Sequence, residues 1–175
     1  KILNRGMTQV MDYGIVNGKS FFCTCGVGFD AFISQKFAES GKRGPVSYLE
    51  NVLNNSLKYH PETYDVEIVN NKDNEEIHQA CKAFLISCAN ASQYGNNAYI
   101  APGATMKDGK MDVIIMEPFD ALEAPQIAAD LFMKTLGNNS KIKTFRTDRI
   151  HIRRQQPGAI HYDGDPIMTG TDIDV

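Results

Sequence analysis

Two short acidic turns carry the residue types best suited to chemistry. Asp163 and Asp165 flank a glycine in the stretch HYDGDP, so a tight turn could bring both carboxylates together. Such a pair can remove a proton from a substrate or bind a cation. The stretch ATMKDGK offers one carboxylate, Asp108, and free backbone carbonyls, a set of oxygen atoms compatible with a hydrated Mg²⁺ or Ca²⁺. A plain hairpin turn is the alternative for each stretch.

Neither turn fits a helix–loop–helix calcium site. With Gly109 or Gly164 as the sixth loop residue, the first, third and twelfth positions do not supply the required carboxylates. The sequence also has no GxSxG, HExxH or Walker A motif. His161 lies beside the second turn, and a single histidine is more often structural than catalytic.

A further acid, Asp30, lies in CGVGFDA, which matches the G-x-G-x-x-A form of a dinucleotide-binding loop. That fold also needs an acid at a strand end about 20 residues later, and Glu50 falls within a helical pattern instead. Two other interpretations stay open. Asp30 could cap the following helix, or it could meet a polar ligand group at the mouth of an apolar site lined by Phe29, Phe32 and Phe37.

The elements that would position these acids are mostly strands. Asn17-Gly18 between two apolar runs predicts a hairpin, because both central residues of a type I′ turn need positive φ. Helical patterns cover 30–40, 47–59 and 122–136, whereas alternating or apolar strand patterns cover 64–69, 77–91, 111–117 and much of 143–175. We therefore predict a mainly β fold: a two-sheet antiparallel β-sandwich with helical insertions.

Composition and charge narrow the partners. The formal net charge is −3, which argues against a nucleic-acid partner. No apolar run reaches the roughly 18 residues that a membrane-spanning helix needs. Arg149, His151 and Arg153 share one face of a predicted strand, which predicts a solvated face or, alternatively, contact with an anionic lipid surface.

The four cysteines are predicted to be free, buried thiols. Cys23 and Cys25 are separated by one residue, and Cys81 and Cys88 by six. These spacings are not those of a tetrahedral zinc site.

Three stretches resemble one family. NGKSFFCTCGVGFDA, CANASQYGNNAYIAPGATMKDGKMDVII and HYDGDP follow the order and spacing of the C-terminal domain of the diacylglycerol kinase and sphingosine kinase-like lipid kinases. The resemblance implies that residues 11–175 form the lipid-substrate domain and that residues 1–10 are the remnant of an interdomain linker or helix. It implies the NAD kinase/diacylglycerol kinase-like β-sandwich. It also implies an N-terminal nucleotide-binding domain outside this chain.

The function that the resemblance implies is ATP-dependent phosphorylation of a lipid hydroxyl, on a diacylglycerol-like or sphingoid-like long-chain alcohol. The nucleotide-binding domain would hold ATP-Mg²⁺, so this chain alone would be inactive. A cytoplasmic enzyme that associates peripherally and transiently with the membrane surface is implied, and a homodimer is compatible with it.

The resemblance also assigns residues. Asp165 matches the family's catalytic base, where other members carry glutamate. Asp30 matches the position that meets the polar head of the substrate in the sphingosine kinases. Asn90 and Gly95 match the substrate-side turn that faces the interdomain cleft.

A structural Mg²⁺ is implied at the first acidic turn. Its ligands would be the Asp108 side chain and the main-chain carbonyls of Thr105 and Lys110. Lys107 stands where some members have another acid.

Two alternatives remain at this point. The chain could be a non-catalytic sandwich that binds a ligand or a partner, with its Asp-Gly turns serving only as hairpins. It could also be a domain of an NAD-kinase-like enzyme.

Overall fold

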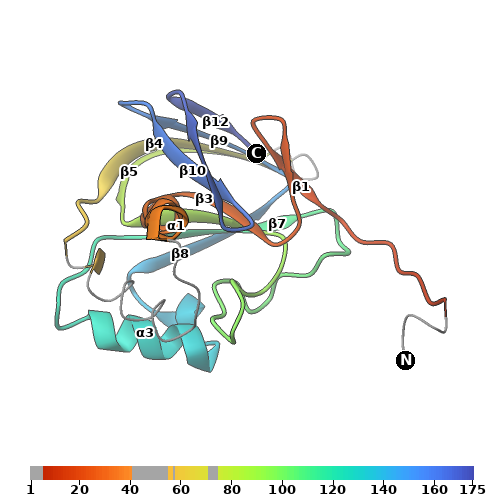
Figure 1. Cartoon of the computed structure of the whole chain (residues 1–175), viewed down its shortest axis with the longest axis horizontal. Helices are drawn as coiled ribbons and strands as arrows, with labels where there is room; N and C mark the ends of the chain where they lie inside the picture. The colour runs from red at the N-terminus through yellow and green to blue at the C-terminus, as the bar shows by residue number, and fades with distance from the viewer. Residues whose placement is uncertain (1–5, 41–54, 57, 71–74) are drawn as a thin grey trace.

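Two antiparallel sheets pack as a sandwich and form the centre of the described structure (Figure 1). The computed structural model describes residues 6–40, 55–56, 58–70 and 75–175. The larger sheet contains, in spatial order, β11 (Asp165–Thr169), β10 (Gly158–Tyr162), β3 (Thr24–Gly28), β6 (Leu85–Ala89), β7 (Met111–Met116) and β8 (Ile142–Thr147). The smaller sheet contains β12 (Asp172–Asp174), β9 (Arg149–Arg154), β4 (Glu62–Asn70) and β5 (Glu75–Ala83). The predicted mainly β sandwich is confirmed.

A separate two-stranded hairpin, β1 (Gly14–Val16) and β2 (Lys19–Phe21), precedes the sandwich. Asn17 and Gly18 form its turn with φ of 45° and 79°, which confirms the predicted type I′ hairpin. The chain leaves this hairpin through Phe22 and Cys23 and only then enters the larger sheet.

Side-chain alternation along β6 divides the interior into two cores. Ile86 and Cys88 belong to the core between the sheets. Leu85 and Ala89 face the other way and belong to a second core that the helices cover. Because successive strand residues point to opposite faces, Ser87 shares the helix-side face, and a polar residue is thereby placed beneath the helices.

The helices lie on the outer face of the larger sheet. α1 (Phe29–Ser40) packs on β10, β3, β11 and β6, and α3 (Ala124–Met133) with the 3₁₀ turn η2 (Leu136–Asn138) covers the β7–β8 side. Lys134 ends α3 in a left-handed conformation, φ 64°, so the predicted helix over 122–136 is shorter than expected. The predicted helix over 47–59 lies largely outside the described residues.

One predicted strand, over 77–91, is in fact two strands in different sheets. β5 ends at Ala83 and β6 begins at Leu85, so the chain crosses between the sheets at Phe84. The amide of Phe84 donates to the Met116 carbonyl at 2.7 Å, and its own carbonyl accepts from the Phe29 amide at 2.9 Å. The apolar sequence hides this junction because residues on both sides of it are buried.

A buried arginine connects the two sheets where β9 lies next to the β10–β11 hairpin. Arg154, 5% exposed, donates from Nη1 to the Ala159 carbonyl at 2.8 Å and from Nη2 to the Gly158 carbonyl at 2.5 Å. Nη2 also reaches the Thr169 hydroxyl at 2.8 Å, and Nε reaches the Gly170 carbonyl at 3.2 Å. A single guanidinium therefore joins β9 to both strands of the β10–β11 hairpin.

Candidate functional site

A buried polar cluster lies beneath α1, on the helix-side face of the larger sheet. Asp30, 7% exposed, lies in the first turn of α1. One of its carboxylate oxygens accepts from the Tyr94 hydroxyl at 2.5 Å and lies 3.6 Å from Nε2 of His161. The Tyr94 hydroxyl also lies 3.2 Å from the Ser87 hydroxyl. We call Asp30, Ser87, Tyr94 and His161 the Asp30 cluster.

The sheet register explains why these side chains meet. His161 of β10, Gly26 of β3 and Ser87 of β6 are direct cross-strand partners in one row. A Cβ on Gly26 would come within 2.6 Å of the Ile86 carbonyl and 3.3 Å of both Asp30 Oδ2 and His161 Nε2. Because residue 26 is glycine, the Asp30 carboxylate has room to lie against this row of the sheet.

The loop after β6 brings Tyr94 to this cluster. Asn96 and Asn97 adopt φ of 48° and 63°, and Gly95 adopts φ of 117°. These values favour Asn and Gly. The turn is closed by hydrogen bonds from Ala98 to the Gly95 carbonyl and from Tyr94 to the Ala98 carbonyl. Gly95 was predicted to contribute to substrate binding; the structure shows it shaping the loop that presents Tyr94.

His161 is an unusual member of the cluster. It is 3% exposed, and neither ring nitrogen has a hydrogen-bond partner within 3.5 Å among the described residues. Buried polar atoms are seldom left unpaired, because desolvation then goes uncompensated. Its neighbour Asp30 provides an acceptor slightly beyond hydrogen-bond distance, so a small inward shift of either side chain would pair them.

Aromatic side chains border the cluster. Phe29 stacks on Phe84 with ring centroids 4.6 Å apart and contacts Phe32 and Tyr59 at 6.1 and 5.6 Å. Phe119 contacts Phe84 from the other side at 4.6 Å. The interpretation of Asp30 as a helix cap is wrong, since α1 already begins at Phe29. The alternative, an acid next to an apolar site, agrees with this arrangement.

The second acidic turn is built by Asp163. Its carboxylate accepts from the amides of Phe22, Cys23 and Thr24 at 2.7, 2.7 and 3.1 Å. Its own φ of 49° and that of Gly164, 89°, form the two-residue turn between β10 and β11. Asp163 therefore fixes the segment between the first hairpin and β3, a structural role that the sequence did not reveal.

Asp165, the predicted base, is the first residue of β11 and is exposed. It pairs with Tyr162, whereas His161 pairs with Pro166. Because directly paired residues share a face, Asp165 lies on the face opposite to His161 and Asp30. The two predicted acids are near in the sheet but do not point into one cavity.

The side chain of Asn90, directly after β6, connects this strand to two segments that precede β3. It is 4% exposed, and its side-chain amide donates to the carbonyls of Phe22 at 2.8 Å and Asp12 at 3.0 Å. Asp12 in turn accepts from the Gly109 amide at 2.8 Å. Asn90 therefore links β6 to the 105–110 loop, and its predicted contact with substrate stays a prediction.

The predicted Mg²⁺ loop is already neutralised by a cation of the protein. The Asp108 carboxylate forms an ion pair with Arg146 and accepts from the Lys110 amide at 3.0 Å. Arg146 also lies 3.9 Å from Asp112. A guanidinium on the one carboxylate ligand does not suit a divalent ion. The proposed ligand set of Thr105, Asp108 and Lys110 remains a prediction.

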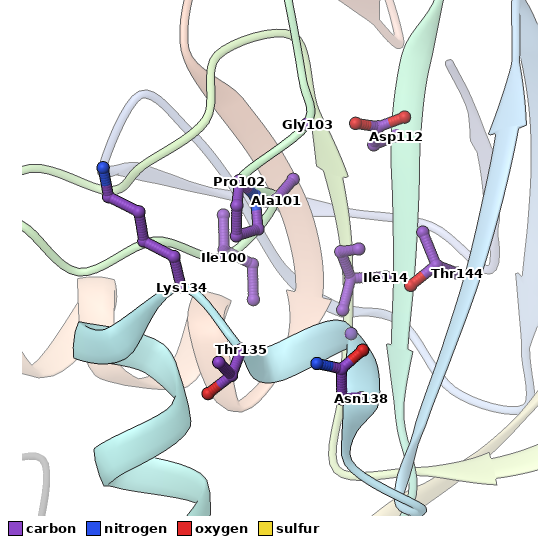
Figure 2. A pocket seen from close by; sticks show the side chains of 11 residues that line it. Ile100, Ala101, Pro102, Gly103, Asp112, Ile114, Lys134, Thr135, Asn138 and Thr144 are labelled. Carbon is purple, nitrogen blue, oxygen red and sulfur yellow. The ribbon is translucent and has the colours of Figure 1, made fainter.

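A pocket of about 250 Å³ lies between β7, β8 and the α3–η2 turn (Figure 2). Asp112 and Lys134 lie on opposite sides of it, and Ile114 is at its floor. Burial raises the pKa of the Asp112 carboxyl, and Arg146 opposes that shift. This pocket does not include Asp30, Asn90 or Asp165, so the predicted site residues are not its lining.

The cysteines are all free, as predicted, but they are not all buried. Cys25 and Cys88 are buried, Cys81 is intermediate and Cys23 is exposed. Desolvation, and after it the charge of Asp163, raise the pKa of the Cys23 thiol above its ordinary value.

We expect alkylation of Cys23 by iodoacetamide to be slow at neutral pH and to accelerate as pH rises through that raised pKa, because the thiolate reacts. Asp163→Asn removes the negative charge, lowers the pKa of Cys23 and moves the rate profile toward lower pH. Peptide mass spectrometry identifies the labelled thiol. An unmoved midpoint would contradict the electrostatic explanation.

A sandwich of this topology, with a helix-covered acid beneath α1, defines an NAD kinase-like β-sandwich domain. Residues 23–171 match the family described as the YegS C-terminal NAD kinase beta sandwich-like domain, and the chain belongs to that family.

Several other proteins are similar to this chain. An uncharacterized protein of Synechocystis sp. is 26% identical to this chain. The alignment covers 95% of this chain and 39% of that protein. A protein of Bacillus anthracis str. Sterne, proposed to be a diacylglycerol kinase, superposes with a TM-score of 0.65 at 17% identity and covers 99% of this chain and 55% of its own. A second structure, described as a diacylglycerol kinase of the same organism, gives a TM-score of 0.57 at 16% identity. At these identities the structural likeness shows the fold. The chain spans about half the length of these structures.

Proposed function

We propose that this chain is the lipid-acceptor domain of an ATP-dependent lipid kinase. The observation that carries the proposal is the Asp30 carboxylate, buried beneath α1 and bordered by aromatic rings, in a chain of this family. A long-chain alcohol needs an apolar surface for its chain and a polar group for its head. Asp30 and Tyr94 supply the polar group, and Phe29, Phe32 and Tyr59 supply the apolar surface.

Phosphoryl transfer requires few catalytic groups from the lipid-acceptor domain. Catalysis depends chiefly on positioning and on neutralising charge around the transferred group. A nucleotide-binding domain would provide those groups together with ATP-Mg²⁺. This domain would then orient the acceptor hydroxyl. Asp165 would accept the proton at the start of the edge strand β11, so the bound lipid would have to extend from the Asp30 cluster past that edge to the opposite face of the sheet.

Exposed apolar side chains within residues 10–22 offer a surface for the nucleotide-binding domain. Val10, Tyr13, Ile15 and Phe22 are exposed, each by half or more of its surface. They lie beside Asp12, which is hydrogen-bonded to the 105–110 loop. We assign this apolar segment to contact with the nucleotide-binding domain. In the described residues no helix is both long and apolar enough to cross a membrane, and peripheral contact with a lipid surface is part of the proposal.

The test is a phosphorylation assay with radiolabelled ATP and a panel of lipids: diacylglycerol, a sphingoid base and a long-chain polyprenol. The longest natural polypeptide that contains these 175 residues is expected to label one lipid class. Residues 1–175 alone are expected to label none, because the sequence has no nucleotide-binding loop. Robust labelling by residues 1–175 alone would overturn the division of roles, and no labelling by the longer polypeptide would favour a non-catalytic binding domain.

A further inference from the structure

The outward face of the smaller sheet carries imidazoles and carboxylates in one cross-strand row. His78 of β5 lies opposite Glu67 of β4, and Glu67 lies opposite His151 of β9. Glu76, two residues before His78, is on the same face of β5. We propose that His78, Glu67 and Glu76 form a binding site for a divalent transition-metal ion of the Zn²⁺ type.

The side chains are already close to a metal-binding arrangement. Glu76 Oε1 lies 3.1 Å from His78 Nε2, and Glu67 Oε2 lies 3.9 Å from His78 Nδ1. One ligand atom from each of the three residues falls within 4.8 Å of the others. Tetrahedral ligands at bond lengths of about 2.1 Å are about 3.4 Å apart, so rotamer changes alone could complete the site.

The site lies beside a surface hollow of about 330 Å³. Glu67, His78 and His151 line this hollow together with Asp65 and Arg153. A bound ion would therefore have room to complete its coordination with water, as an open zinc site requires.

The charge pattern favours a cation. Glu67 and Glu76 flank His78 as two carboxylates. Arg153, a neighbouring cation on this face, is hydrogen-bonded to Asp172 at 2.9 Å and also acts on Glu67 through its charge. A metal ion bound by neutral His78 would add positive charge between the two carboxylates.

The ligand types select the class of ion. Carboxylates alone would suit Mg²⁺ or Ca²⁺, whereas an imidazole combined with carboxylates suits Zn²⁺ and its neighbours. The scaffold is also suited to holding them: β4 is paired along its length to β5 on one side and to β9 on the other. Glu67 therefore projects from a strand that is paired on both sides, and His78 and Glu76 project from the adjacent edge strand β5.

The experiment titrates Zn²⁺ into the untagged full chain in competition with a chromophoric chelator. A Cys23→Ser background removes the exposed thiol as a competing ligand. We expect one equivalent to bind, a rise in melting temperature with Zn²⁺, and no comparable effect of Mg²⁺. His78→Asn and Glu67→Gln should each weaken binding by at least about tenfold, the loss that even an outer-shell partner can produce.

Two histidine variants serve as controls. His60→Asn, on an exposed residue outside the sheet, should bind as the parent does. His151→Asn tests the competing cluster, because His151 Nδ1 and Nε2 lie 2.7 and 3.4 Å from Asp174 and Asp172. If His151→Asn abolishes binding and His78→Asn does not, or if no equivalent binds at all, the proposed site is wrong. His60 and His78 are exposed and Glu67 and His151 are partly exposed, so the metal-free variants should melt close to the parent. The readout does not depend on kinase activity.

Discussion

Asp165→Asn is expected to reduce lipid phosphorylation by about 10²–10⁴-fold in the polypeptide that also carries the nucleotide-binding domain, the range that positioned proton acceptors contribute. The reason is chemical: the amide is nearly the same shape as the carboxylate but cannot take the proton of the acceptor hydroxyl. The measurement is kcat with saturating lipid and ATP. The KM for lipid should change little, because Asp165 is exposed and lies apart from the Asp30 cluster.

Asp165→Glu is the matched control. It introduces the glutamate that the resemblance to the lipid kinases implies at this position, and its longer side chain keeps the carboxylate on the same turn. The turn itself is held by Asp163 and Gly164, so neither substitution should alter the fold. Retained kcat in Asp165→Asn would remove Asp165 from the mechanism and direct attention to the buried Asp30–His161 pair as the remaining acid–base candidate.

Arg154→Met is expected to lower the free energy of unfolding by about 3 kcal/mol or more. Methionine fills the volume of the side-chain stem but leaves the carbonyls of Gly158, Ala159 and Gly170 without their donor. Gly158 and Ala159 are half-buried and Gly170 is exposed, so the cost of about 1–3 kcal/mol for an unsatisfied buried group applies chiefly to the first two carbonyls. For a chain of this length, this loss corresponds to a fall in melting temperature of about 6–12 °C.

Arg153→Met is the internal control for that experiment. Arg153 is the adjacent residue on the opposite face of β9, where it is exposed and pairs with Asp172 at 2.9 Å. Exposed ion pairs contribute little to stability, so this variant should melt close to the parent. Equal melting temperatures for the two variants would show that the guanidinium network of Arg154 is not what holds the β10–β11 hairpin.

Local patterns in the sequence were sufficient to predict where most strand residues lie and to predict the first hairpin. Asn17-Gly18 sits where only a turn with two positive φ values fits, and alternation along 64–69 marks a half-buried strand. The crossing at Phe84 was not predictable in this way. Both flanks of Phe84 are buried, and what separates them is the hydrogen bonding of one residue to Met116 and Phe29.

The candidate site was likewise only partly predictable from the sequence. Asp30 stood out because an acid follows a glycine-rich strand end, and its burial agrees with a special role. Tyr94, Ser87 and His161 come from three separate segments, and only the register of β10, β3 and β6 brings them together. Asp163 was read as one of a reactive pair because pattern alone does not show that its carboxylate is occupied by three backbone amides.

The crossing at Phe84 also has a consequence for motion. Its amide and carbonyl connect the last residue of β7 with the first residue of α1, so one residue links both sheets and the helix that carries Asp30. Local opening of either sheet would break these bonds as well. Cooperative units of this kind resist partial unfolding, and the acid in the first turn of α1 is therefore held in place before any ligand arrives.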